Sequence, residues 1–371
     1  NGVVFAKISW HSVDKNSSVW VSNIPTRHLR LGPAEFRETA AVFFGAPSPV
    51  ATALEGQGIW SKGGENRGVC DKFGLKLGSL NLDKRFTTAH DAVKFAIARA
   101  LQALGVDYMS EVHGLFTPVI PPGNMANARR AMQGRPWGGG GNGARQGLVP
   151  DFKVEIEGLN AGAAGTAELV ELKMLRCGST SRNPIGGSTY ATRGITSVLS
   201  GHRRAVHKRA ETIQREREAD ARKIDRLFCD TPQGQDGPVL QRLRSFGPVI
   251  GAVVGHFGEW NDGLERLLSA ACSDAAPRMC ALFGLKTVRA SHGYCARLFR
   301  NEVAWAGLNA NAKLRLERAE FVGWDARTAG ANRAQQARAD NAQRERAAWA
   351  ATAFRNERQG LYGGERAPRG G

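Results

Sequence analysis

LVPD at residues 148–151 and LVELK at residues 169–173 are the two stretches that decide the fold and the function expected of this chain. Each has the apolar, β-branched character of a strand. Side chains alternate between the two faces of a strand, so Glu171 and Lys173 point one way while the residue between them points the other. If the strand that carries Asp151 pairs beside this one, two carboxylates and one ammonium group converge at a single edge of a sheet.

That combination of residue types suits the hydrolysis of a phosphodiester. Carboxylate oxygens are natural ligands of Mg²⁺, which keeps its other positions for water and phosphate. A lysine beside them can orient the attacking water and offset the charge on the phosphate. We therefore take Asp151, Glu171 and Lys173 as candidate catalytic residues, with Mg²⁺ as the expected cofactor and Mn²⁺ as a substitute.

Periodicity predicts the elements around the two stretches. Residues 87–104 have the spacing of an amphipathic helix that stops at Gly105. Strands are predicted next, and a long charged helix comes before the last of them. That last strand is almost wholly apolar, which is typical of a strand buried on both faces. The predicted strands are 107–116, 148–156, 167–175 and 248–255, and the charged helix is 202–228. The predicted order is helix, three strands, helix, strand.

This order and the residues Pro150, Asp151, Glu171 and Lys173 resemble the PD-(D/E)XK nuclease superfamily. The resemblance covers roughly residues 85–260 and implies an α/β fold, a restriction-endonuclease-like core with a mixed sheet and the active site on its central hairpin. Acidic-x-Lys triplets are common by chance, and Asp151-Phe152-Lys153 is a second one here. The specificity comes from the context, which is a single Pro-Asp pair, a strand on each motif and a loop between them.

The resemblance also implies further ligands. Asp151, Glu171 and the backbone carbonyl of Leu172 are the expected metal ligands, and Glu111 is either another one or an exposed strand residue. The family usually takes an early acidic residue from its first helix, where this chain offers only Asp91. Its second helix often adds a polar residue, and the candidates are Arg204, His207, Lys208 and Glu211, unless they form a solvated helix face.

The rest of the chain divides into regions of different character. Residues 1–84 are expected to be irregular, and residues 261–325 helical because of one apolar leucine face. Residues 326–371 are rich in Ala, Arg and Gln and predict a helix followed by a disordered tail. A loop at 121–147 with a four-glycine run interrupts the core. It is expected to lack structure, either as a basic arm beside the site or as a tolerated surface insertion.

Composition indicates the kind of partner. The 371-residue chain carries a formal net charge of +17, which favours a polyanion such as nucleic acid, with DNA preferred over RNA. The residues expected to contact phosphates come from the loop and from the start of the charged helix: Arg129, Arg130, Arg135, Arg145, Arg203, Arg204 and Lys208. No apolar run is long enough to span a membrane. The six cysteines show no zinc-binding spacing, and we expect reduced thiols in an intracellular protein.

These observations leave two classes of function. The first is a metal-dependent endonuclease, in the manner of mobile-element-encoded proteins with Arg-rich helical regions. The second is a non-catalytic nucleic-acid-binding or packaging protein, or a degenerate nuclease fold kept as a scaffold. A binding protein has no need for Asp151, Glu171 and Lys173 together, so the placement of these three residues discriminates between the two.

Overall fold

The structure is a computed structural model of the chain. It describes residues 9, 12, 14–23, 30–61, 64–79, 85–133, 148–156, 159, 167–175, 179–180, 183–184 and 201–323. The region 326–371 and part of the 121–147 loop lie outside these residues.

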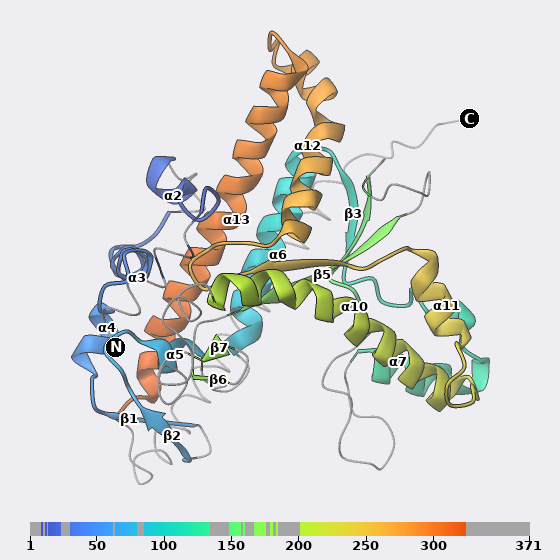
Figure 1. Cartoon of the computed structure of the whole chain (residues 1–371), viewed down its shortest axis with the longest axis horizontal. Coiled ribbons are helices and arrows are strands. Elements are labelled where there is room, and N and C mark those ends of the chain that lie inside the picture. Colours follow the sequence, from blue (N-terminus) through green and yellow to red (C-terminus); the bar gives the residue numbers. More distant parts are fainter. Residues whose placement is uncertain are drawn as a thin grey trace, which may run out of the picture.

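A four-stranded mixed sheet forms the centre of the molecule (Figure 1). Its strands follow the spatial order β3-β4-β5-β8, in which β3/β4 and β4/β5 are antiparallel and β5/β8 is parallel. Their bounds are β3 (Asp107–Ser110), β4 (Phe152–Glu155), β5 (Glu168–Met174) and β8 (Ile250–Val254). The sequence prediction of an α/β fold with a mixed sheet is confirmed.

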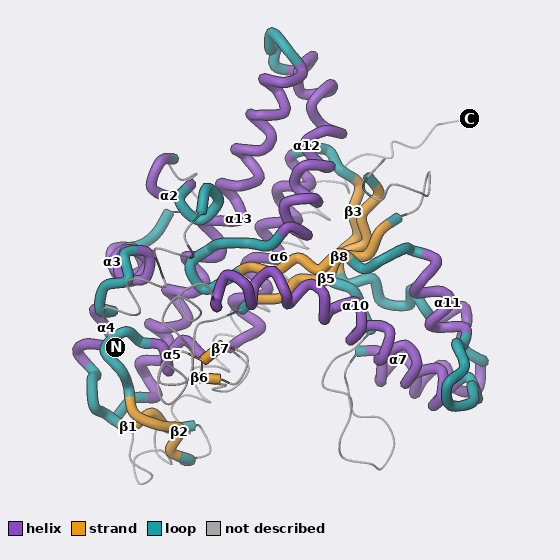
Figure 2. The backbone as a smooth tube through the Cα atoms, viewed as in Figure 1, coloured by secondary structure: helices purple, strands orange, loops and turns teal. Residues whose placement is uncertain are grey.

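Helices cover both faces of this sheet (Figure 2). Even-numbered strand residues such as Val170 and Leu172 belong to one apolar core, which α6 (Arg85–Ala103), α12 (Asp262–Leu282) and α13 (Val288–Arg318) complete. Odd-numbered residues such as Leu169 belong to a second core on the opposite face, built with α10 (Gly201–Phe228) and α11 (Pro238–Ser245). The alternation places Glu171 and Lys173 on the α10 face, as a period of two predicts.

Three helix predictions are close to the structure. Helix α6 matches the one predicted at 87–104, and α10 matches the one at 202–228. The described part of the region predicted to be helical, 261–323, consists mainly of α12 and α13, which pack as a long hairpin that reaches beyond the sheet (Figure 1), with η4 (Ala319–Phe321) at its end. No helix in the described parts of the chain is long and apolar enough to cross a membrane.

Two predictions in the middle of the chain were wrong. The strand predicted at 107–116 ends at Ser110, because Glu111 has a positive φ of 48° that a strand does not accommodate. The loop at 121–147 is not structureless over its first half, since η2 (Thr117–Val119) and η3 (Pro122–Asn124) lead into α7 (Met125–Met132). Ala128, Ala131 and Met132 are buried at helical spacing, and this pattern was masked by the adjacent proline and glycine residues.

The expectation of an irregular N-terminal region was also wrong. The described part contains α2 (Val19–Ser22), α3 (Pro33–Phe43), α4 (Pro49–Ala53), β1 (Gly58–Trp60), β2 (Asn66–Val69) and α5 (Leu75–Ser79). Proline stands in the first turn of α3 and of α4, and Ser48 caps α4, which are standard helix starts. Helices α2, α3 and α5 pack against α13, and α4 packs against α3. The remaining strands, β6 (Ser179–Thr180) and β7 (Asn183–Pro184), form a separate two-stranded sheet.

Candidate active site

The strand register brings Asp151 and Glu171 opposite each other. Phe152 pairs with Val170 in the antiparallel β4/β5 ladder, and one further step along the same register pairs Asp151 with Glu171. The peptide N–H of Glu111 donates to the carbonyl of Asp151 at 3.0 Å and so extends the β3/β4 pairing past its last strand residue. Asp151 and Glu171 therefore occupy adjoining backbone positions, and Lys173 forms an ion pair with Glu171.

Asp151 is held by groups from two elements. Its Oδ2 accepts a 2.8 Å hydrogen bond from the backbone N–H of Leu172 and lies 3.5 Å from Nε2 of His90. Burial raises the pKa of Asp151, but hydrogen bonding to His90, the charge of His90, the Leu172 N–H and the charge of Lys173 together outweigh it and lower the pKa. The carboxylate is thus kept ionised, as a metal ligand requires.

His90, on α6, is the site residue that the sequence analysis missed. Its Nε2 lies 3.2 Å from the carbonyl oxygen of Leu172 as well as near Asp151, and its Nδ1 lies 3.2 Å from Oδ1 of Asp91. Burial lowers the pKa of His90, whereas Asp151 and Asp91 outweigh that effect and raise it. The position of His90 on the first helix, next to Asp91, could have pointed to it. The resemblance led us to look only for an acidic residue on that helix.

Glu171 lies at the buried end of the site, on the side of α10. Its Oε1 accepts from Nζ of Lys173 at 2.5 Å and lies 3.7 Å from the guanidinium of Arg217. Arg217 is itself buried and lies 3.5 Å from Asp220. The second oxygen of Glu171, Oε2, is buried and has no hydrogen-bond partner among the residues that the structure describes. An unpartnered buried carboxylate oxygen is costly, so this atom is suited to a cation or a water.

Glu111 lies on the other side of Asp151 and pairs with Lys94 of α6. The Lys94 side chain is almost fully buried and also lies 3.5 Å from Asp91. Burial lowers the pKa of Lys94, but Glu111, Asp91 and Asp151 outweigh it and raise the pKa, which keeps the ammonium charged. The expected further ligand is therefore bound to a lysine, with 54% of its side chain exposed.

The residues expected to contact phosphates divide into three groups. Arg203, Arg204 and Lys208 are exposed on the first turns of α10, and it is Arg217, further along the same helix, that reaches Glu171. Nine to fourteen residues of helix correspond to roughly 13–21 Å along the axis. Arg129 and Arg130 are exposed on α7. Arg135 and Arg145 lie outside the described residues.

No group of three or more His, Cys, Asp or Glu side chains in the described ranges is arranged to hold a metal ion. Mg²⁺ does not require one, since it is usually held by one or two carboxylates and completes its shell with water and substrate phosphate. Asp151, the Leu172 carbonyl and Oε2 of Glu171 are oxygens of that kind, and the Leu172 carbonyl lies 3.2 Å from Nε2 of His90.

Comparison with protein-family models, with curated proteins and with solved structures found no match to this chain.

Proposed function

We propose that this chain is a metal-dependent nuclease with a restriction-endonuclease-like core, which hydrolyses phosphodiester bonds in nucleic acid, with DNA as the preferred substrate. The observation that supports the proposal is that Asp151, which accepts from the Leu172 N–H, and the Glu171–Lys173 ion pair come from adjoining positions at one end of the β4/β5 ladder. A helix, three strands, a helix and a strand surround them in the order expected of that core.

Asp151, Glu171 and the carbonyl of Leu172 are the groups that would hold Mg²⁺ or Mn²⁺. When bound there, the ion would supply charge stabilisation for the phosphate and a more acidic water. Hydrolysis then adds water across the phosphodiester, so that one P–O bond forms and one breaks. The protein's own part is to place the phosphate and the water on the oxygen-lined side of the β4/β5 pair.

Lys173 and His90 have separate roles in this proposal. Lys173 donates to Glu171 in the absence of substrate, and its Nζ is the cation from which an attacking water or a phosphate oxygen accepts a hydrogen bond. His90 orients Asp151 from behind, with Asp91 on its other nitrogen. Arg217 fixes the Glu171 side chain in place as a positioning residue.

The formal net charge of +17 supports a nucleic-acid substrate, because phosphate contacts dominate such binding. Exposed arginines on α7 and α10 provide cations on two elements beside the sheet. The remaining alternative is a nucleic-acid-binding scaffold that kept a degenerate nuclease fold. One observation favours it: Oε1 of Glu171 is already neutralised by Lys173 and Arg217.

A cleavage assay separates the two functions. The full chain is incubated with labelled single- and double-stranded DNA and RNA, with Mg²⁺, with Mn²⁺ and with EDTA. Glu171→Gln should abolish cleavage, and Lys173→Ala should lower the rate by orders of magnitude while leaving metal binding nearly unchanged, because a protonated lysine is not a ligand. Glu155→Gln is the matched control, since Glu155 is an exposed carboxylate at the far end of β4. Binding without any metal-dependent cleavage would leave the scaffold as the function.

A further inference from the structure

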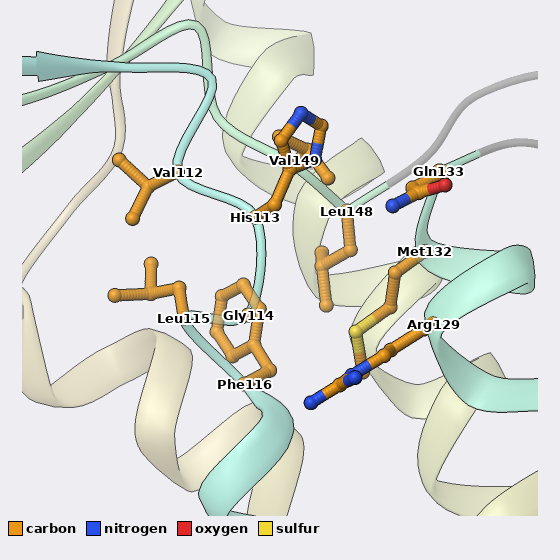
Figure 3. A pocket seen from close by; sticks show the side chains of 10 residues that line it. All are labelled: Val112, His113, Gly114, Leu115, Phe116, Arg129, Met132, Gln133, Leu148 and Val149. Atoms are coloured by element: carbon orange, nitrogen blue, oxygen red, sulfur yellow. The ribbon is translucent and has the colours of Figure 1, made fainter. Parts of the chain in front are cut away.

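A small cavity of about 280 Å³ lies beside the proposed active site (Figure 3). It is formed by the segment that follows β3, by the last turn of α7 and by the residues that enter β4. Its lining includes the apolar side chains of Phe116, Met132 and Leu148, and Val112 lines it from the segment that follows β3, whereas polar groups stand beside them. This volume is just below that of small-molecule sites, which start at about 300 Å³, and suits one planar ring system rather than a peptide or a whole nucleotide.

The cavity adjoins the catalytic residues through the backbone. Val112 directly follows Glu111, whose N–H donates to the carbonyl of Asp151, and Val149 lies two residues before Asp151. Two extended residues span about 7 Å. A group held in the cavity would therefore lie about one nucleotide from a phosphate at Asp151.

The polar groups at the border match the chemistry of a nucleobase attached to its phosphate. Figure 3 shows the His113 imidazole, the Gln133 amide and the Arg129 guanidinium around the apolar wall. An amide can donate and accept at the edge of a base, and a guanidinium both stacks on a ring and binds a phosphate. A ring with apolar faces, a polar edge and an attached anion matches this arrangement.

We propose that this cavity binds one unpaired nucleobase next to the scissile phosphate, so that the substrate is single-stranded or locally unpaired nucleic acid. The position of the phosphate, at Asp151, rests on the proposed nuclease function. A base that is still stacked and paired within a duplex cannot enter a cavity of this shape, so a paired substrate would have to extrude it first.

Binding in the absence of metal tests the cavity separately from cleavage. The full-length chain is titrated in EDTA with a single-stranded oligonucleotide that carries 2-aminopurine, and with the matching duplex. We expect tighter binding of the single strand. Val112→Phe, which enlarges a residue that lines the cavity, should weaken single-strand binding by about tenfold or more, the size of one base contact. Duplex binding should change by less than about twofold.

Two further variants make the result decisive. Val69→Phe enlarges an exposed valine on β2, away from the cavity, and should have no effect. Arg129→Gln changes an exposed residue at the border, so it should fold normally and still weaken single-strand binding several-fold. Equal affinity for single strand and duplex, or an unchanged affinity in both Val112→Phe and Arg129→Gln, would overturn the inference even if metal-dependent cleavage is found. If binding depends on the cavity but no cleavage is found, the base-binding proposal is supported and the nuclease proposal is contradicted.

Discussion

Glu38 of α3 and Arg315 of α13 form a buried ion pair that joins the N-terminal region to the rest of the fold. Both side chains are at most 2% exposed, and Nε of Arg315 lies 3.4 Å from Oε2 of Glu38. The guanidinium also donates to the backbone carbonyl of Glu38 at 3.1 Å. Glu38 in turn accepts from the Ser48 hydroxyl at 2.7 Å and from the Val50 N–H at 2.8 Å. We predict that Glu38→Gln will strongly destabilise the protein.

The size of this effect follows from the burial of Arg315. Burial lowers the pKa of Arg315 to about 10, even though the charges of Glu38 and Asp71 act to raise it. One pKa unit corresponds to about 1.4 kcal/mol, so this lowering means that burial destabilises the charged guanidinium by about 3 kcal/mol even when its partners are present. Removing the Glu38 charge leaves the guanidinium less compensated, and breaking such a pair typically costs about 3–5 kcal/mol. This is a large part of the roughly 5–15 kcal/mol of a typical domain.

Urea denaturation followed by circular dichroism measures the loss. The double variant Glu38→Gln/Arg315→Met should recover at least about half of it, because it removes the uncompensated charge together with its partner. Glu35→Gln on the same helix is the control, since Glu35 forms no ion pair among the described residues, and it should cost less than about 1 kcal/mol. A loss below about 1 kcal/mol for Glu38→Gln, or strictly additive losses in the double variant, would refute the reasoning.

Three further predictions follow from the charged groups. His90→Ala should lower the cleavage rate by about 10–100-fold, the usual effect of losing a group that orients a metal ligand, and leave the affinity for nucleic acid unchanged; an unaltered rate would remove His90 from the site. Affinity for nucleic acid should fall steeply with salt, and Arg129→Gln should reduce the slope of log K against log salt by about one, whereas a flat response would exclude phosphate contacts. Burial raises the pKa of Glu265, but hydrogen bonds from Trp260, Lys15 and Arg300 outweigh it and lower the pKa, so this carboxylate stabilises the fold above its unfolded-state pKa of about 4.5, and the stability is lost as pH falls through the lower folded-state pKa. The melting temperature of Glu265→Gln should therefore lie below that of the unmodified protein at pH 7, and the difference should shrink steadily as the pH is lowered below about 4.5; a constant difference would contradict this.

The sequence was sufficient for features that depend on local periodicity. Alternation along 168–174 placed Glu171 and Lys173 on one face, and helical spacing located α6 and α10 to within two residues at each end. The sequence was insufficient where an element is very short, or where a side chain's contacts come from a distant part of the chain. Helix α7 has only eight residues and lies between proline and glycine runs, so its pattern was too short to recognise.

The partners of the site residues come from distant parts of the chain, and no local pattern announces them. His90 reaches Leu172 across 82 positions, and Arg217 reaches Glu171 from the middle of a helix with many charged residues. The sequence analysis considered the first turns of α10, because His and Arg cluster there. Arg217 contacts Glu171 because of the way α10 packs across the sheet, which the sequence of the helix does not show. The pairing of Lys94 with Glu111 likewise depends on how α6 meets the end of β3.

The most direct test of the account is the cleavage rate of Asp151→Asn at saturating nucleic acid and saturating Mg²⁺. The asparagine side-chain oxygen can still accept from the Leu172 N–H, so the local structure should survive while the negative charge of the ligand is lost. The account predicts an unchanged melting temperature to within a few degrees, unchanged nucleic-acid binding in EDTA, and a cleavage rate at least about a thousandfold below that of the Glu155→Gln control, a difference of about 4 kcal/mol in barrier. Cleavage by Asp151→Asn at the rate of the control would contradict the account.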